Sequence, residues 1–318
     1  MNTDKSIYLT IFSYLLISFT VFTQVNSTNL ILNKFVENDT KRLVEVFRDI
    51  HSNRELGSME LRTAAIVTKE LKALGFEAKA GIGKAGVVGI LKNGIGPIVM
   101  YCADMNCNSV QETTAIAYAN NKLVKNRLGE DVPAMEACGH DAHRTWMLGI
   151  AKAIVALKKD CSRTLMMVGQ HAEELGEGVE AMINDKMSEK GVPVPDYLFE
   201  MHTAPFLVGI ISNRSGRRMT GMDVLGVEFQ GICPRQNIKN IPAVMGSEDF
   251  RHLVIHNPKP VYAYVLVCIA NKEASEKATK EGEMFPFFNH NSNFGVDLSA
   301  IPLGVTLGTT ALLEIFKK

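Results

Sequence analysis

The sequence predicts an α/β protein, a three-layer sandwich built around a mostly parallel central sheet. Two observations lead to this prediction. Short apolar runs flanked by glycine or proline, which are typical of buried strands, alternate with segments whose apolar residues recur every three to four positions, as in amphipathic helices. Strands that alternate with helices favour parallel pairing. With 318 residues, 46% of them hydrophobic, the chain can bury a sizeable core.

The expected elements form one compact domain from about residue 37 onward. We expect helices at 37–53, 58–75, 142–158, 176–185, 248–255 and 298–316. We expect strands at 86–91, 97–102, 164–169, 196–202, 207–212, 223–229 and 261–267. Asp141 is expected to cap the third helix, and Ser247 the fifth.

Composition argues against several classes of protein. The 34 basic and 34 acidic residues balance without a basic block, which argues against a nucleic-acid partner. A charged fraction of 21% argues against a disordered chain or a coiled coil. Six cysteines are too few for a disulfide scaffold.

The first 27 residues are expected to be a secretory signal peptide. Residues 7–22 are apolar or hydroxylated and uncharged, Lys5 precedes them, and residues 25–27 form a loose cleavage site. Cleavage would leave a mature chain of residues 28–318, secreted or periplasmic and without stable membrane insertion. The alternative is an uncleaved anchor, because the apolar stretch is only slightly shorter than a bilayer span.

The strongest candidate site is the segment ACGHDAH at 137–143, just before the third helix. Gly139 lets the backbone turn so that the Cys138 thiolate and the His140 imidazole face one point, which suits zinc or a similar divalent metal. Asp141 could orient a ligand from behind as well as cap the helix. The alternative is a buried cysteine beside two surface histidines.

Further polar residues fall at the ends of expected strands, where open α/β sheets build their sites. Of the adjacent Glu173 and Glu174, one could bind a metal while the other takes a proton from activated water. Alternatively, both are solvated residues that open the next helix. His202 and His290 are candidate ligands, or else an ordinary strand-end histidine and part of a turn. Asp104 could buttress a histidine ligand or cap a turn.

Together these segments supply five candidate ligands: Cys138, His140, Glu174, His202 and His290. Five are too many for one catalytic zinc, which usually keeps three protein ligands and an open position. They suit two metal ions that share a bridging ligand, and Cys138 is the natural bridge.

These motifs resemble the di-metal amidohydrolases and metallopeptidases of the aminoacylase and carboxypeptidase type. The branch they resemble contains hippurate hydrolases, N-acyl-amino-acid amidohydrolases and auxin-conjugate hydrolases. The similarity is ordered along nearly the whole mature chain. It comprises His51 to Leu56, Ala103 to Met105, the ACGHDxH motif at 137–143, Ala172 to Glu174, Met201-His202 with Pro205, the MGSEDF motif at 245–250, and His290-Asn291.

The resemblance implies roles for these residues. Cys138, His140, Glu174, His202 and His290 would bind two divalent ions, either zinc or manganese, with cobalt as a further option. Glu173 would be the general acid and base. The implied reaction is hydrolysis of the amide bond in N-acyl amino acids or short peptides, within a zinc-peptidase-like catalytic domain.

The chain also departs from that family. Family members usually insert a lid domain, which mediates dimerisation, before the MGSEDF motif. Here residues 230–243 replace it, a length that makes a loop, so we expect a monomer. That loop holds no histidine to polarise the substrate carbonyl as the family's lid does. Cys102, Asn106 and Glu136 stand where the family usually has arginine, aspartate and histidine.

Three interpretations therefore remain open. The chain could be a lidless hydrolase, a metal-binding but catalytically weak descendant that binds acylated amino acids or peptides, or a truncated product that folds poorly. Retention of all five ligands and of Glu173 favours the hydrolase, because a pure binder would not need a base. The missing lid favours the other two.

Overall fold

The computed structural model describes residues 4–212, 238–239, 250–254 and 260–316. Its α-helices are α1 (Asp4–Ser52), α2 (Leu61–Ala73), α3 (His140–Ala156), α4 (Gly178–Asn184), α5 (Lys272–Lys280) and α6 (Ala300–Phe316). Short 3₁₀ helices span Lys158–Asp160, Glu173–Leu175 and Phe250–Val254.

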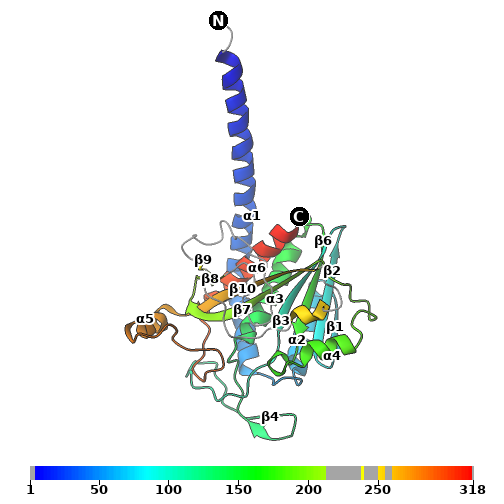
Figure 1. The fold of residues 1–318 in the computed structure, drawn as a ribbon, viewed down its shortest axis with the longest axis vertical. Helices are drawn as coiled ribbons and strands as arrows, with labels where there is room; N and C mark the ends of the chain where they lie inside the picture. Colours follow the sequence, from blue (N-terminus) through cyan, green and yellow to red (C-terminus); the bar gives the residue numbers. More distant parts are fainter. Residues whose placement is uncertain (1–3, 213–237, 240–249, 255–259, 317–318) are drawn as a thin grey trace.

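The main sheet has its strands in the order β1 (Glu77–Ile82), β2 (Gly86–Asn93), β6 (Arg163–Gln170), β3 (Ile98–Asp104), β7 (Tyr197–Leu207), β10 (Val261–Ala270), β8 (Ile211–Ser212) and β9 (Ile238–Lys239). The central strands β6, β3, β7 and β10 are parallel. β1, β2 and β8 add antiparallel pairings at the two sides. The separate ribbon of β4 (Val124–Lys125) and β5 (Asp131–Val132) lies at the far end of the molecule from the N-terminus (Figure 1). The expected mostly parallel α/β sheet is confirmed.

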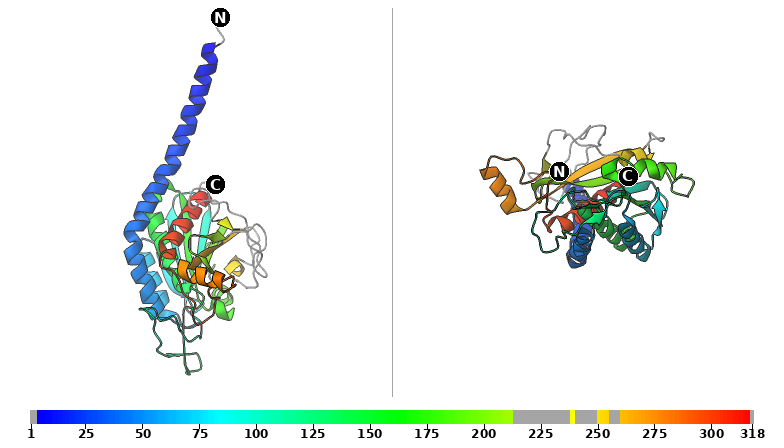
Figure 2. Two further views of the ribbon diagram at one scale, coloured as in Figure 1. Left: turned by 90° about the vertical axis from the view of Figure 1, so that its left-hand side faces the viewer. Right: turned by 90° about the horizontal axis from the view of Figure 1, so that it is seen from below.

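One face of this sheet is covered by α1, α2, α3 and α6, which lie together on one side in Figure 2. Their shared core includes Leu43, Phe47, Trp146 and Val305, all essentially inaccessible to solvent. The opposite face buries a second apolar cluster, in which side chains of the sheet meet Val179 and Met182 of α4, together with the 3₁₀ helix that begins at Phe250. The sheet is thus the middle of three layers.

Helix α1 is much longer than the helix expected at 37–53. Its apolar residues at positions 32, 36, 43, 47 and 50 are buried, and this spacing places them on the face that packs against α3 and α6. Its first turns project away from the sheet (Figure 1). Among the described residues, we find no helix with both the length and the apolar character needed to cross a membrane.

Other boundaries also differ from expectation. The two strands expected at 196–202 and 207–212 are one strand, β7, followed by the two-residue β8. The helix expected at 248–255 is a 3₁₀ helix at Phe250–Val254, and its proposed cap, Ser247, lies outside the described residues. The strand expected at 223–229 also lies outside them, as does most of 230–243.

Apart from the two-residue strands β4, β5 and β9, two elements were not expected at all. β1 exposes most of its side chains, and the highly charged α5 buries only Ala278. Apolar periodicity, the signal used for the other elements, is therefore weak in both.

The packing of α3 against α6 yields a first prediction. Gly304 faces Trp146, whose indole N–H donates a hydrogen bond to the Ala300 carbonyl oxygen at 3.1 Å. A Cβ atom on Gly304 would overlap the buried indole ring, so Gly304→Ala should lower the free energy of unfolding by about 1–3 kcal/mol despite the better helix propensity of alanine. Chemical denaturation measures this change. Gly295→Ala is the control, because its Cβ would meet open space; equal effects of the two variants would contradict the packing argument.

Candidate active site

The polar residues singled out in the sequence converge at the carboxyl end of the parallel strands. Asp104 ends β3, and Glu173 and Glu174 follow β6. His202 was expected to end its strand, but it lies in the middle of β7, which continues to Leu207. α3 begins beside them at His140. This edge is where open α/β sheets bind ligands.

The backbone turn before α3 brings Cys138 and His140 together. Gly139 has φ 79°, the left-handed region that favours glycine, and a Cβ there would lie 2.6 Å from Thr203 Cγ2. Cys138 Sγ lies 3.5 Å from His202 Nε2 and accepts a hydrogen bond from Asn289 Nδ2 at 3.3 Å. Gly139, rather than Asp141, occupies the N-cap position, so the expected Asp141 cap is wrong.

His140 is held as a neutral imidazole. Burial lowers its pKa to about 3, and its Nδ1–H donates to the Asn106 carbonyl oxygen at 2.7 Å. Its Nε2 is therefore a lone-pair donor atom; it is buried and takes part in no hydrogen bond among the described residues. Carboxylate oxygens of Asp104, Glu173 and Glu174 lie 3.9, 3.8 and 3.9 Å from this nitrogen.

Those separations suit a shared cation better than hydrogen bonds. Ligand atoms about 2.0–2.2 Å from one tetrahedral metal lie roughly 3.3–3.6 Å from each other. The described residues form two groups of possible ligands. Within each group all ligand atoms lie within 4.8 Å of one another, and His140 belongs to both groups. The first group comprises Cys138, His140 and Glu174, and the second comprises Asp104, His140, His143 and His202. The donor set therefore fits a divalent metal centre.

His143 is a support rather than a ligand in this arrangement. Its Nε2 accepts the Thr203 backbone N–H at 3.2 Å, so its Nδ1 carries the proton and donates to Asp104 Oδ2 at 3.1 Å. Both ring nitrogens are occupied. Asp104 was expected to buttress a histidine ligand; instead, His143 orients Asp104, whose oxygen lies among the candidate ligand atoms.

The remaining two histidines reach the cluster from β7 and from the loop before α6. His202 Nδ1–H donates to the Thr203 carbonyl oxygen at 2.9 Å, which leaves Nε2 facing Cys138. His290 lies 2.9 Å from Glu174 through its Nε2, and its backbone N–H donates to the Ala137 carbonyl oxygen at 2.7 Å. Burial alone would raise the pKa of Glu174, but the hydrogen bond from His290 and nearby charges lower it to about 2. All five expected ligands thus converge.

Buried hydrogen bonds hold the turn between β6 and the 3₁₀ helix that carries Glu173 and Glu174. Ala172 has φ 50°, and its N–H donates to Glu60 Oε1 at 2.7 Å. The Glu173 N–H donates to Asn106 Oδ1 at 2.8 Å. The sequence assigned no role to Glu60, and it marked Asn106 only as a departure from the family. Only their buried contacts show that they hold this turn.

Asp141 belongs to a different buried cluster, behind the candidate ligands. Its Oδ2 accepts a hydrogen bond from His51 Nδ1 at 2.7 Å, and His51 Nε2 lies 3.2 Å from Glu112 Oε1. Asp141 therefore orients His51, not the metal ligands it was expected to orient. Burial alone would lower the pKa of His51, but the two carboxylates raise it to about 10.

This cluster predicts a pH dependence of stability. Because the pKa of His51 is higher in the folded chain than its usual value of 6.5, its stabilising effect is complete below pH 6.5 and is lost as the pH rises through about 10. We expect the free energy of unfolding of the wild type, measured by denaturant titration, to fall over that interval. His51→Gln should be less stable at pH 6 and should flatten this part of the profile. Parallel profiles for wild type and variant would contradict a charged His51.

Comparisons with known proteins agree with the fold and with this set of motifs. Residues 119–217 match the sequence profile of peptidase family M20/M25/M40. The hippurate hydrolase of Campylobacter jejuni is 39% identical over 163 residues, which cover 51% of this chain and 39% of that protein. The IAA-amino acid hydrolase ILR1-like 4 of Arabidopsis thaliana is 29% identical over 231 residues, or 70% of this chain and 50% of that protein. The chain spans about half the length of the curated relatives it matches.

A solved structure shows the same fold. The YXEP protein of Bacillus subtilis, described as a dinuclear metal binding peptidase from the M20 family, superposes with a TM-score of 0.69 at 16% identity, covering 88% of this chain and 99% of that one. The profile match includes the segment that carries Cys138, His140, Glu173, Glu174 and His202. The resemblance inferred from the motifs is confirmed: over residues 119–217 this chain is similar to the M20/M25/M40 peptidases.

Proposed function

We propose that the chain is a metal-dependent amidohydrolase that cleaves the amide bond of N-acyl amino acids or short peptides. The observation that carries this proposal is the buried His140 Nε2, which makes no hydrogen bond with the described residues and lies 3.8–3.9 Å from three carboxylates. The names of the relatives support the substrate class, since hippurate and IAA-amino acids are both amides of an acyl group with an amino acid.

The metal centre would hold two divalent ions, zinc, manganese or cobalt. Cys138, His140, Glu174, His202 and His290 would be the ligands, and the structure adds Asp104 as a further candidate. The ions would lower the pKa of a water molecule and polarise the substrate carbonyl.

Glu173 would move the proton. Its carboxylate faces His140, and its backbone is fixed by Asn106, so it can accept a proton from the attacking water. It would then return that proton to the nitrogen of the departing amino group, while the water oxygen remains on the acyl carbon as part of the new carboxylate.

The absence of a lid domain would affect both the turnover rate and the oligomeric state. Loss of one preorganised oxyanion donor typically costs about 10²- to 10³-fold in kcat, so turnover should be slow compared with an enzyme that has the donor. Without the lid's usual interface, the chain would act as a monomer. A protein that binds metal and acylated amino acids without turnover would be a binding module instead.

Metal content tests the first half of this proposal. Purified full-length protein, reconstituted with zinc, manganese or cobalt, should hold about two ions per chain by elemental analysis, since the donor atoms form two overlapping groups. Cys138→Ser should lower occupancy of both sites. Cys161→Ser is the control, because Cys161 precedes the opposite end of β6. Absence of bound metal in wild-type protein after reconstitution would refute the metal centre.

Substitution of Glu173 tests the second half. Glu173→Gln keeps the shape of the side chain but cannot accept a proton, so kcat on an N-acyl amino acid should fall by about 10²- to 10⁴-fold with metal content unchanged. Glu174→Gln should lower the metal content itself. Glu177→Gln, which removes an exposed partner of Arg127, should do neither. The hydrolase proposal fails if metal-loaded wild type turns over no N-acyl amino acid or dipeptide, or if Glu173→Gln is fully active.

A further inference from the structure

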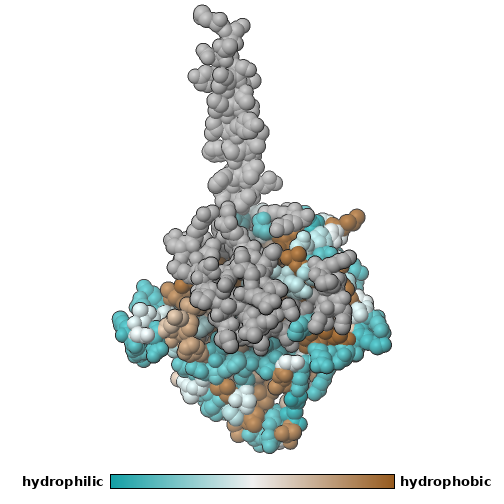
Figure 3. Space-filling view, in the orientation of Figure 1, coloured by the Kyte–Doolittle hydropathy of each residue, from teal (hydrophilic) through white to brown (hydrophobic). Residues whose placement is uncertain are grey.

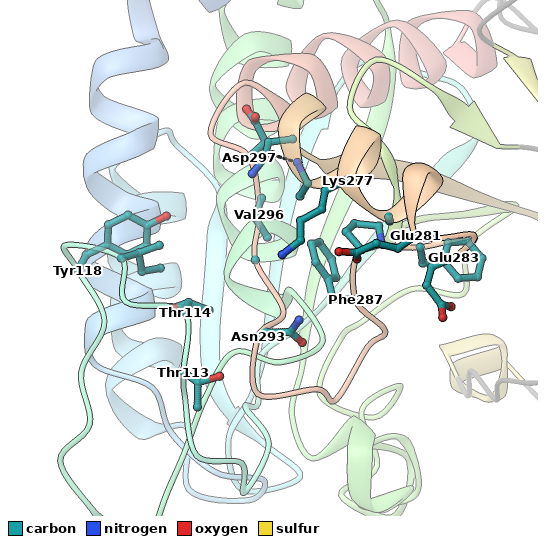
Figure 4. A pocket seen from close by; sticks show the side chains of 17 residues that line it. Thr113, Thr114, Tyr118, Lys277, Glu281, Glu283, Phe287, Asn293, Val296 and Asp297 are labelled. Atoms are coloured by element: carbon teal, nitrogen blue, oxygen red, sulfur yellow. Dashed lines mark hydrogen bonds between the residues drawn. The ribbon is translucent and has the colours of Figure 1, made fainter.

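A cavity lies between the 113–118 loop, α5 and the segment 281–297 (Figure 4). Its volume is about 540 Å³, within the range of small-molecule sites. The described residues that line it include neither Glu173 nor any proposed metal ligand. The cavity is therefore separate from the candidate active site.

The cavity combines an apolar floor with charges of both signs, Lys277 and the carboxylates of Glu281, Glu283 and Asp297. Ala278 and Phe287 on the floor are buried, and Val296 is half-buried. Lys277 and Glu281 are exposed, lie one helical turn apart, and reach the space in front of Phe287 (Figure 4).

These two charges have no partners in the described part of the chain. The ion pair on α5 joins Lys272 to Glu276, and neither Lys277 nor Glu281 forms one there. A ligand that carried only a negative charge would meet three carboxylates, and one that carried only a positive charge would leave Lys277 without a partner. A ligand with an ammonium and a carboxylate close together would complement both.

We propose that this cavity binds a free α-amino acid with an apolar side chain. Its carboxylate would face Lys277, its ammonium would face Glu281, and its side chain would cover Phe287 and Val296. The chemical class follows from the cavity alone. A regulatory role for this binding site rests on the proposed function, since a free amino acid is a product of that reaction.

Two series of side-chain contacts connect the lining of the cavity to the metal motif. On one side, the Thr114 hydroxyl donates to Glu112, and the ring of Tyr118 lies 5.0 Å from that of His51. His51 in turn binds Asp141, the neighbour of the proposed ligand His140.

On the other side, the Phe287 and Phe294 rings meet edge to face at 5.2 Å. Phe294 lies against Gly139, between Cys138 and His140, since a Cβ on that glycine would be 3.2 Å from the phenylalanine ring. An occupant resting on Phe287 is therefore two side-chain contacts from the turn that positions both ligands.

Calorimetric titration with L-phenylalanine tests the binding site. We use full-length protein treated with EDTA, so that binding of the amino acid at the metal centre does not contribute. We expect one saturable site, whose Kd rises about threefold to tenfold in Lys277→Met and in Glu281→Gln. Lys280→Met, on the same helix but outside the cavity, is the control and should leave Kd unchanged. 3-Phenylpropionate and 2-phenylethylamine, which each lack one charge, should bind more weakly than L-phenylalanine.

Several outcomes would overturn the proposal. One is the absence of saturable binding, and another is binding that Lys277→Met and Glu281→Gln leave unchanged. Equal affinity for the singly charged analogues would refute recognition of a zwitterion. None of these results depends on turnover, so a protein that binds L-phenylalanine but hydrolyses nothing refutes only the proposed function.

Regulation is tested separately, by steady-state kinetics of the metal-loaded enzyme. Added L-phenylalanine should change kcat in the wild type and not in Lys277→Met. Competition by product at the metal centre would raise KM alone, and that result would refute regulation through the cavity.

Discussion

The hydrogen bond from His140 Nδ1 to the Asn106 carbonyl oxygen is the contact on which the candidate site depends. It leaves the other ring nitrogen as the lone-pair donor. The side chain of the same Asn106 accepts the N–H of Glu173, so one residue positions both a proposed ligand and the proposed base. Arg144 reinforces this segment by donating to the neighbouring Met105 carbonyl oxygen. The separation of ligand and base is therefore set by one buried residue after β3, through its backbone carbonyl on one side and its side-chain amide on the other.

The charges around this contact are divided between two sides. Behind it, the positive charge of His51 lies between Asp141 and Glu112, and its two ring nitrogens contact both carboxylates. In front, Asp104, Glu173 and Glu174 surround the neutral His140, so carboxylates outnumber cations. Carboxylates held close together repel one another, and a divalent cation removes that cost while supplying coordination bonds. The electrostatics of the chain thus agree with the fit of its donor atoms to a metal centre.

Local sequence patterns predicted those parts of the fold that bury apolar residues at a regular spacing. The strands near residues 86, 98, 163 and 261 appear where expected, and so does α6. β1 and α5 were missed because they bury few side chains.

For the site, the sequence identified which residues have the right chemistry, but not which side each one faces. Asp141 follows His140 in the chain yet faces His51, because one residue step along a helix turns the side chain by about 100°. Such assignments need three-dimensional contacts.

Two departures from the related family become intelligible through these contacts. Glu136, in place of histidine, adds a buried carboxylate that pairs with Arg144, and the same guanidinium reaches the carbonyl of Met105. Asn106, which follows Met105, stands in place of an aspartate, so this position carries no negative charge. An amide still offers Oδ1 to the Glu173 N–H, so the hydrogen bond that positions the base is kept. The two changes offset each other in charge, in a region where Glu60 and Glu136 are already buried and burial raises the pKa of both. An aspartate at 106 would add a further charge there, at the free-energy cost of burying it without a new partner.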